Sequence, residues 1–342
     1  MTRTFKKKEV FAMTRTFKSG IFFLCVFLIG TLLWVPADRA GAETQEVRIG
    51  HLSYSPMEPP YPKIFIEELN RFGWTEGKNI TIEWRSIDGD EKRLPEVLSE
   101  LLGLDLGVLV TMTTPITSAA KKANTKIPIV FWACSDPLGS KIVPSLSQPG
   151  GNITGVSQMD TELCGKRVQI LTEVMPHLKR LGVLLNPTVS YVPAMLTRTR
   201  QAAATANLEV RLFEATSPEE LDSAFMAMDR EDVEAFVQIP HIMYWDNRKR
   251  IVNLAARHRL PGLYETTEFV DDGGLMAYAE NLPEHVRRAA AYVDQILRGK
   301  DPADLPIAQP MVFELAVNLR TANSLGLKIP ESILTLAEHI VE

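Results

Sequence analysis

Residues 94–112 read LPEVLSELLGLDLGVLVTM and contain two patterns of different period in direct succession. Apolar residues first recur three and four positions apart, at Leu94, Val97, Leu98, Leu101 and Leu102. This spacing forms one apolar stripe along the face of a helix. Residues 106–112 are then a short apolar run of the kind found in buried strands. A helix followed at once by a buried strand predicts a parallel sheet whose strands are joined by helices.

The same alternation continues on both sides of this segment. Further strands are predicted at residues 47–52, 79–85, 127–132, 152–157, 181–185, 208–213, 233–239, 262–264 and 275–279. Helices are predicted near residues 60–72, 161–175, 190–206, 218–229, 244–258 and 283–298. The sequence therefore predicts an α/β fold with parallel sheets. Because about 300 residues exceed what one hydrophobic core usually serves, we expect two Rossmann-like lobes.

Two pairs of glycines interrupt the alternation, Gly150-Gly151 and Gly273-Gly274. Paired glycines allow a sharp change of chain direction because they tolerate positive φ. If each pair marks the approach to a crossing between lobes, residues 46–157 plus 273–300 form one lobe and residues 158–270 plus 305–342 the other. The proline-rich segment 300–310 then makes a third crossing. The alternative is one continuous sheet with glycine loops.

The first 42 residues have the composition of a secretory signal peptide. A basic start is followed by an uncharged apolar run at residues 21–35 and by the small residues Ala40-Gly41-Ala42, which predicts cleavage before Glu43. The alternative is a membrane anchor, but this apolar run is shorter than the roughly 20 residues needed to span a bilayer. We expect a periplasmic protein that is not inserted in the membrane after cleavage. The hexapeptide MTRTFK occurs at residues 1 and 13, so Met13 is an alternative start.

The charge of the mature chain disfavours some partners. The whole sequence has a formal net charge of −5, and residues 1–42 hold seven of its 37 basic and two of its 42 acidic residues. The mature chain therefore carries 30 basic and 40 acidic residues, a net charge of −10. Nucleic acids and anionic membranes are bound through clustered Lys and Arg, so neither is expected as a partner. Cys134 and Cys164 remain, either joined in a disulfide or as two buried thiols.

Motifs of catalysis and cofactor binding are missing from the sequence. The six histidines form no HExxH pattern and have no histidine three or four positions away, so no metal site is predicted. There is no GxSxG elbow, and no GxGxxG follows a predicted strand. We therefore expect no cofactor and no enzymatic activity. An active site assembled from scattered residues is the remaining alternative.

Polar residues gather instead where predicted strands end, which is where ligands bind in open parallel sheets. The predicted ligand-binding residues are Ser53, Tyr54, Thr113, Thr114, Ser135, Asp136, Asn186, Gln238, Tyr264 and Tyr278. Thr113 and Thr114 precede Pro115, which is typical of the start of a helix. Their hydroxyls either cap that helix or, together with its free N–H groups, bind a carboxylate. Asp136 either binds an ammonium group or braces the turn before Pro137.

Several longer stretches resemble one known family. They include FGWTEGKNITIEWR at residues 72–85, IPIVFWACSDPLGS at 127–140, SLSQPGGNITGVS at 145–157 and GGLMAYA at 273–279. The mature chain resembles the tryptophan- and tyrosine-binding type of ABC transporter substrate-binding proteins, which belong to the type I periplasmic binding proteins. The resemblance implies two lobes joined by a three-crossing hinge, and a small amino-acid or related carboxylate ligand in the cleft between them.

The same resemblance implies partners and a function. They are an ABC permease and its ATPase, served by an extracytoplasmic solute-binding receptor that works as a monomer. One alternative is a ligand-sensing domain for a membrane signalling partner, which uses the same fold. A less favoured alternative is an α/β enzyme.

Overall fold

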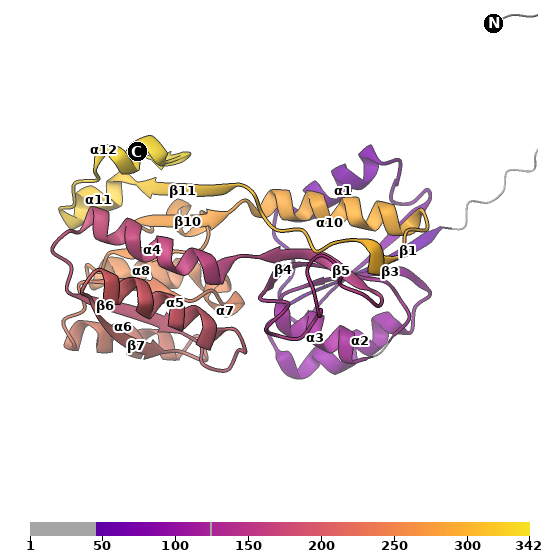
Figure 1. Ribbon diagram of the computed structural model, residues 1–342, viewed down its shortest axis with the longest axis horizontal. Helices are drawn as coiled ribbons and strands as arrows, with labels where there is room; N and C mark the ends of the chain where they lie inside the picture. Colours follow the sequence, from indigo (N-terminus) through magenta and orange to yellow (C-terminus); the bar gives the residue numbers. More distant parts are fainter. Residues whose placement is uncertain (1–45, 124) are drawn as a thin grey trace, which may run out of the picture. The chain divides into compact units, whose positions relative to one another are not determined.

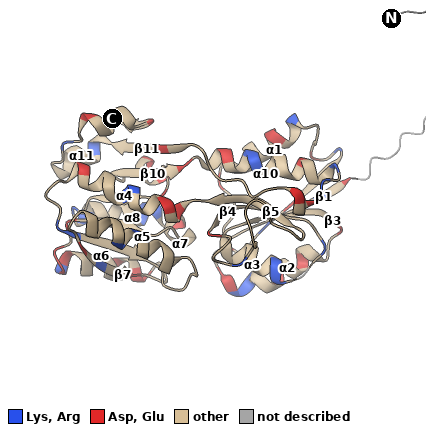
Figure 2. Cartoon of the chain, viewed as in Figure 1, with Lys and Arg blue, Asp and Glu red and all other residues tan. Residues whose placement is uncertain are grey.

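The computed structural model describes residues 46–123 and 125–342, and Thr44–Glu342 forms one compact unit. The predicted signal peptide lies outside the described residues. Within the described part of the chain, every helix is too short or too polar to serve as a membrane span. Figure 2 shows Lys and Arg interspersed with Asp and Glu over the helices, the usual pattern of a solvated surface.

The first sheet has five parallel strands in the order β2-β1-β3-β4-β5. These strands are β1 (Val47–Ser53), β2 (Ile80–Ser86), β3 (Leu106–Met112), β4 (Ile129–Ser135) and β5 (Ile153–Gln158). One face packs on α1 (Tyr61–Arg71) and α10 (Leu282–Leu297), and the other on α2 (Leu94–Leu102) and α3 (Thr114–Lys122). Figure 1 shows α10 beside α1 although they are far apart in sequence. Together these elements form the first lobe.

The second sheet has seven strands in the order β12-β11-β10-β9-β8-β6-β7. Its strands are β6 (Arg180–Leu185), β7 (Glu209–Glu214), β8 (Ala235–Gln238), β9 (Gly262–Tyr264), β10 (Met276–Glu280), β11 (Phe313–Asn318) and β12 (His339–Val341). One face packs on α4 (Asp160–Val174), α5 (Val192–Thr205), α11 (Leu319–Leu325) and α12 (Glu331–Leu336). The other packs on α6 (Glu220–Arg230), α7 (Ile242–Asp246), α8 (Arg248–Arg257) and α9 (Glu268–Asp271). These elements form the second lobe.

The chain crosses between the lobes three times, at residues 158–160, 280–282 and 309–312. We call these three segments the hinge. Neighbouring strands of the second sheet are parallel except for β10 and β11. Because β10 leaves the second lobe at the hinge and β11 re-enters it there, the two strands must run in opposite directions. The α/β fold with two lobes is confirmed, with this one antiparallel pair added.

The structure corrects two of the predicted lobe boundaries. The segment that starts at Gly273 was assigned to the first lobe, but β10 pairs with β9 and β11 in the second sheet. A Cβ at Gly274 would lie 2.6 Å from the Tyr264 ring, so this glycine provides room for a buried side chain rather than a crossing. Residues 305–308 were assigned to the second lobe, but Leu305 and Ala308 form hydrogen bonds with β5 of the first lobe.

The structure also shows whether Cys134 and Cys164 are joined in a disulfide. Cys134 on β4 and Cys164 on α4 are both buried and free, and they belong to different lobes. Of the two alternatives left open by the sequence, the structure therefore has the buried thiols.

Polar contacts join the lobes directly, away from the hinge. Ser55 donates a hydrogen bond to Asp246, and Tyr61 donates one to Glu268. Arg248 Nη2 lies 3.1 Å from Glu58 Oε2, and its guanidinium stacks 4.6 Å above the Trp245 ring. These three contacts join residues of the segment after β1, or of α1, to the region α7–α9. A fourth joins Ser140 Oγ, after β4, to Ser190 Oγ, after β6, at 3.1 Å. The structure is therefore a closed form, in which two separate regions of the first lobe touch the second.

We predict that Gly155→Ala destabilises the protein. Gly155 on β5 has a φ of 155°, and an added Cβ would lie 2.1 Å from the Phe131 backbone oxygen. Overpacking of this kind costs about 1–3 kcal/mol, or more where backbone must move. The thermal unfolding midpoint, measured by circular dichroism, should fall by several degrees. Gly150→Ala is the control, because Gly150 has a φ of 66° but open space around it; equal midpoints for the two variants would contradict the prediction.

We also predict that Arg248→Gln opens the lobes in the absence of ligand. Its side chain is 15% exposed and also lies 2.9 Å from Asp272, so the pair with Glu58 is partly shielded from water. Its loss removes an attraction that exists in the closed form alone, which shifts the population toward open forms. Small-angle scattering should give a larger radius of gyration. Arg250→Gln on the same helix is the matched control, since Arg250 pairs with Asp222 inside the second lobe; the prediction fails if both variants scatter alike.

Candidate functional site

A cleft lies between the lobes at the ends of their strands. The first lobe contributes the ends of β3, β4 and β5 and the segments that follow β1, β2 and β3, and the second lobe the segments that follow β6, β8 and β9; Leu282, after β10, also lines the cleft. In parallel sheets, ligands usually bind at the carboxyl ends of the strands, and the ligand-binding residues are predicted there from the sequence. The aromatic lining residues are Tyr54, Tyr61, Trp132, Tyr191 and Trp245, and the charged ones are Glu58, Glu91 and Glu265. Among the described residues that line the cleft, none is Lys or Arg.

The aromatic wall of the first lobe is held in place from behind. Trp132 is 1% exposed, and its indole N–H donates a hydrogen bond of 3.4 Å to His51 Nε2. Burial lowers the pKa of His51 to about 3, so the imidazole is neutral at physiological pH and can accept that bond. The Tyr61 ring lies 5.9 Å from the Trp132 ring. These contacts give the cleft a fixed, flat apolar surface.

Four of the predicted site residues line this cleft, namely Tyr54, Thr113, Thr114 and Ser135. Neither threonine hydroxyl caps α3, so the capping alternative is wrong. Thr114 Oγ1 instead donates to the Ser135 carbonyl oxygen at 2.9 Å. Thr113 has a φ of 72°, which is rare for a residue with a Cβ, and its buried hydroxyl has no hydrogen-bond partner. Thr113 therefore offers a free hydroxyl next to the first N–H groups of α3, which have no intrahelical partner.

The other six predicted site residues lie outside the lining. Their side chains serve turns or packing contacts instead. Ser53 donates to the Ser55 carbonyl oxygen, Asp136 accepts from the Gly139 N–H, Asn186 accepts from Thr188, Gln238 donates to Glu265, and the Tyr264 and Tyr278 rings stack on Phe269 and Phe313. Asp136 therefore braces a turn, which was the second of its two predicted roles.

The carboxylate that the sequence prediction missed is Glu265. It follows β9 directly, is 7% exposed, and accepts a hydrogen bond from the Gln238 side chain. Burial raises its pKa to about 7, against the lowering effect of the Arg167 charge. Its neighbour Thr266 is also buried, with a hydroxyl that has no hydrogen-bond partner. A signal was present, because Glu265 and Thr266 are the first polar residues after the predicted strand 262–264.

His241 and Trp245 complete the second lobe's side of the cleft. The His241 ring accepts from the Met243 N–H at one nitrogen and lies 3.3 Å from the Asn186 amide at the other. Burial lowers its pKa to about 4, so it adds no positive charge to the cleft at physiological pH. No cluster of three or more His, Cys, Asp or Glu side chains suited to a metal ion occurs among residues 46–123 and 125–342. The cleft thus combines aromatic walls, unpartnered hydroxyls and one buried carboxylate.

The chain is similar to several known proteins in sequence and in fold. A tyrosine-binding protein of Clostridioides difficile is 22% identical over 284 residues, which are 83% of this chain and 81% of that protein. A conserved domain protein of Vibrio cholerae has a crystal structure that superposes with a TM-score of 0.81, at 25% identity, over 86% of this chain and 100% of its own. An ABC domain of Streptococcus pneumoniae in complex with L-Trp gives a TM-score of 0.79 at 22% identity, over 87% and 100% of the two chains.

A family match covers most of the sequence, at residues 62–341. These residues include every strand of the second sheet, four of the five strands of the first and most of the cleft lining. Together with the two lobes and the cleft, the match shows that the chain belongs to the ABC transporter substrate binding protein family.

Proposed function

We propose that the protein is the extracytoplasmic receptor of an ABC importer and binds an amino acid with an apolar or aromatic side chain. The observation that carries this proposal is the closed cleft, in which aromatic walls from both lobes surround one buried carboxylate, Glu265. Such a cleft suits a ligand with one cationic group and a flat apolar part. The tyrosine-binding relative and the L-Trp complex support the same ligand class.

Each part of such a ligand has a complementary group in the cleft. The ammonium group would be bound by Glu265 and Thr266, in place of the Asp136 that the sequence suggested. The carboxylate would be bound by the Thr113 hydroxyl and the N-terminus of α3, where the helix dipole favours negative charge. The side chain would lie between Trp132 and Trp245. A hydrogen bond to a charged group contributes about 1.5–3 kcal/mol, so three such bonds account for much of the roughly 8 kcal/mol of micromolar binding.

Membership of this family also supports the proposed partners and compartment. A substrate-binding protein delivers its ligand to a permease that is driven by an ATPase, and it does no chemistry on that ligand. We propose export through the leader at residues 1–42 and action as a periplasmic monomer. In the closed form, Glu58 and Trp245 both line the cleft and take part in the Arg248 contact between the lobes. Closure around a ligand would thus be linked to this contact between the lobes.

Export predicts a specific amino terminus. Protein recovered from the periplasm should begin at Glu43, because the small residues Ala40-Gly41-Ala42 fit the signal peptidase site. Mass spectrometry of the purified protein measures this directly. A mature chain that retains the apolar run at residues 21–35 would contradict the export proposal.

We predict that Glu265→Gln and Thr113→Ala weaken binding of different parts of the ligand. Isothermal titration calorimetry with three related compounds separates them: an aromatic amino acid, the amine that lacks its carboxylate, and the acid that lacks its ammonium group. Glu265→Gln should weaken the amino acid and the amine roughly 10- to 100-fold, the worth of one charged hydrogen bond, and leave the acid unchanged. Thr113→Ala should weaken the amino acid and the acid instead.

Glu214→Gln is the matched control, because Glu214 is exposed on β7 and its substitution makes the same change of charge away from the cleft. It should bind like the wild type. If Glu265→Gln binds the amino acid as tightly as the control does, the assignment of the ammonium site is wrong. If no amino acid binds the wild type, the proposed ligand class is wrong.

A further inference from the structure

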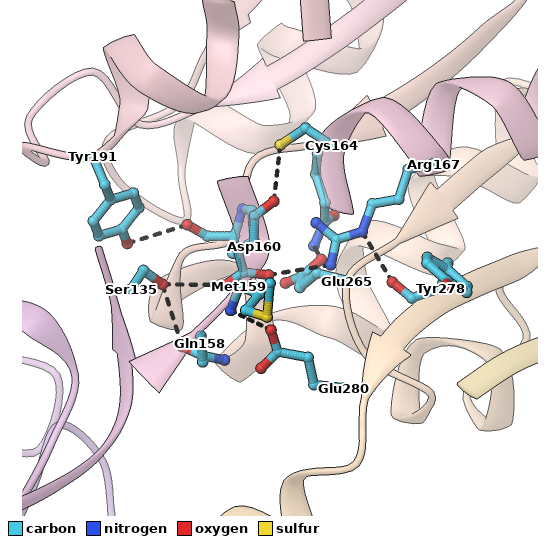
Figure 3. A network of polar contacts seen from close by, with 12 residues as sticks. Ser135, Gln158, Met159, Asp160, Cys164, Arg167, Tyr191, Glu265, Tyr278 and Glu280 are labelled. Atoms are coloured by element: carbon cyan, nitrogen blue, oxygen red, sulfur yellow. Dashed lines mark hydrogen bonds and ion pairs between the residues drawn. The ribbon is translucent and has the colours of Figure 1, made fainter. Parts of the chain in front are cut away.

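A buried arginine lies on α4, between the cleft and the hinge. Arg167 is 2% exposed. Its Nη2 donates to Asp160 Oδ1 at 3.1 Å, and its Nε donates to the Tyr278 carbonyl oxygen on the hinge strand β10 at 3.0 Å. Its Nη1 is buried without a hydrogen-bond partner. Figure 3 shows the guanidinium group beside Asp160 and Glu265. A charge this deeply buried is costly unless neighbouring charges balance it.

The contacts of Asp160 and Glu280 join this arginine to the hinge. Asp160 Oδ2 accepts from Ser135 Oγ of the first lobe at 3.1 Å. The Met159 N–H, in the first crossing, donates to the Glu280 carboxylate, in the second. Figure 3 shows these two contacts next to each other. A shift of Arg167 or Asp160 would therefore act on two of the three crossings and on a residue that lines the cleft.

The same arginine acts electrostatically on the cleft. Burial has the largest effect on the pKa of Glu265 and raises it; a backbone hydrogen bond, the Arg167 charge and the Gln238 side chain lower it, in that order, and the Asp160 charge raises it. Arg167 is the cation that acts on Glu265, since the described cleft lining contains no Lys or Arg. Arg167 and Asp160 therefore have opposite effects on the ionisation of the cleft carboxylate.

The cluster holds more acid than base. Three buried carboxyl groups, those of Asp160, Glu265 and Glu280, lie around Arg167, and the Arg167 charge lowers the pKa values of Glu265 and Glu280. Burial and then the Asp160 charge raise the pKa of Glu280 well above its ordinary value. His285 Nε2 lies 3.3 Å from Glu280, but burial lowers its pKa to about 4, so it adds no charge near neutral pH.

The remaining titratable neighbours stay neutral. The Cys164 thiol faces Arg167, and burial raises its pKa. The phenols of Tyr191, Tyr244 and Tyr264 face Glu265, and burial raises the pKa of each of them. Glu265 is then the carboxyl group of the cleft lining whose ionised form the Arg167 charge favours.

We propose that Arg167 is a positioning residue that favours the ionised form of Glu265 in the closed cleft, and that it shares its charge with Asp160 at the hinge, so that binding of a cationic group depends on pH. The inference rests on the proposed function in so far as the ligand carries an ammonium group. Protonation of Glu265 removes the negative partner of that group, so affinity falls as the pH falls. With a midpoint near 7, binding should weaken about tenfold between pH 8 and pH 6.

Two variants are predicted to move this midpoint in opposite directions. Arg167→Met removes the charge that favours ionised Glu265, so its midpoint rises; a rise of about one pH unit weakens binding at pH 7 roughly fivefold. Asp160→Asn removes a negative charge that disfavours ionised Glu265 and removes the ion pair with Arg167. The midpoint of the Glu265 titration therefore falls, and binding at pH 6 strengthens. Arg167→Lys keeps the charge and should keep the midpoint near that of the wild type. A merely structural role of Arg167 would not produce shifts of opposite sign.

The experiment has two readouts. The first is the ¹³C NMR titration of the Glu265 side-chain carboxyl in ligand-free protein with labelled glutamate, assigned by the signal lost in Glu265→Gln. The second is the affinity for L-tryptophan or L-tyrosine between pH 5.5 and 8.5, measured by calorimetry. Arg180→Met is the control, because Arg180 forms a half-exposed pair with Asp232 at the start of β6. It should leave both readouts unchanged.

The outcomes separate the two proposals. A Glu265 titration that is unchanged in Asp160→Asn and in Arg167→Met overturns the role of Arg167, whatever ligand binds. If Arg167→Met does not fold, Asp160→Asn and Arg167→Lys carry the test alone. Opposite shifts of the titration without binding of either amino acid support the role of Arg167 and overturn the proposed ligand.

Discussion

The direction of the strands at the hinge constrains the rest of the molecule. β5 runs out of the first sheet into the second lobe, and β10 runs out of the second sheet into the first lobe. The other strands of each sheet run parallel to β5 or to β10, apart from β11 and β12. The carboxyl ends of the strands in each sheet therefore point toward the other lobe. The polar residues that follow those strands then meet across one cleft. Thr113, Ser135 and Glu265 come together for this reason, although more than a hundred residues separate the last two.

Much of the fold could be predicted because each strand carries its own apolar pattern. The prediction for residues 106–112 coincides with β3, and the other predicted strands agree with the structure within a few residues. β11 and β12 were missed. β12 has three residues, too few for a periodic pattern, and β11 is antiparallel because of where the chain re-enters the lobe, which no local pattern shows. The glycine pair at 273–274 was misread for a similar reason, since its role is set by a ring that packs against it from Tyr264.

The site could be predicted less well, because a polar residue at a strand end has several possible roles. Thr113 and Asp136 look alike in the sequence, yet the first has an unpartnered hydroxyl in the cleft and the second accepts a bond from its own turn. The pKa of Glu265 depends on burial, on Gln238 and on Arg167, which is 98 positions earlier in the sequence. Such partners meet through the packing of α4 against the sheet, and no spacing in the sequence encodes that contact.

The three crossings also determine how much freedom the lobes have. The first and second crossings are joined by the hydrogen bond that the Met159 N–H donates to the Glu280 carboxylate, and the second and third by the one that the Asn281 N–H donates to the Val312 carbonyl oxygen. Sliding of one lobe along the other would stretch these bonds, whereas rotation about the hinge keeps the three crossings together. Closure of the lobes is then a rotation about the hinge. A motion confined in this way orders few backbone torsions when the cleft closes, so little conformational entropy is lost on binding.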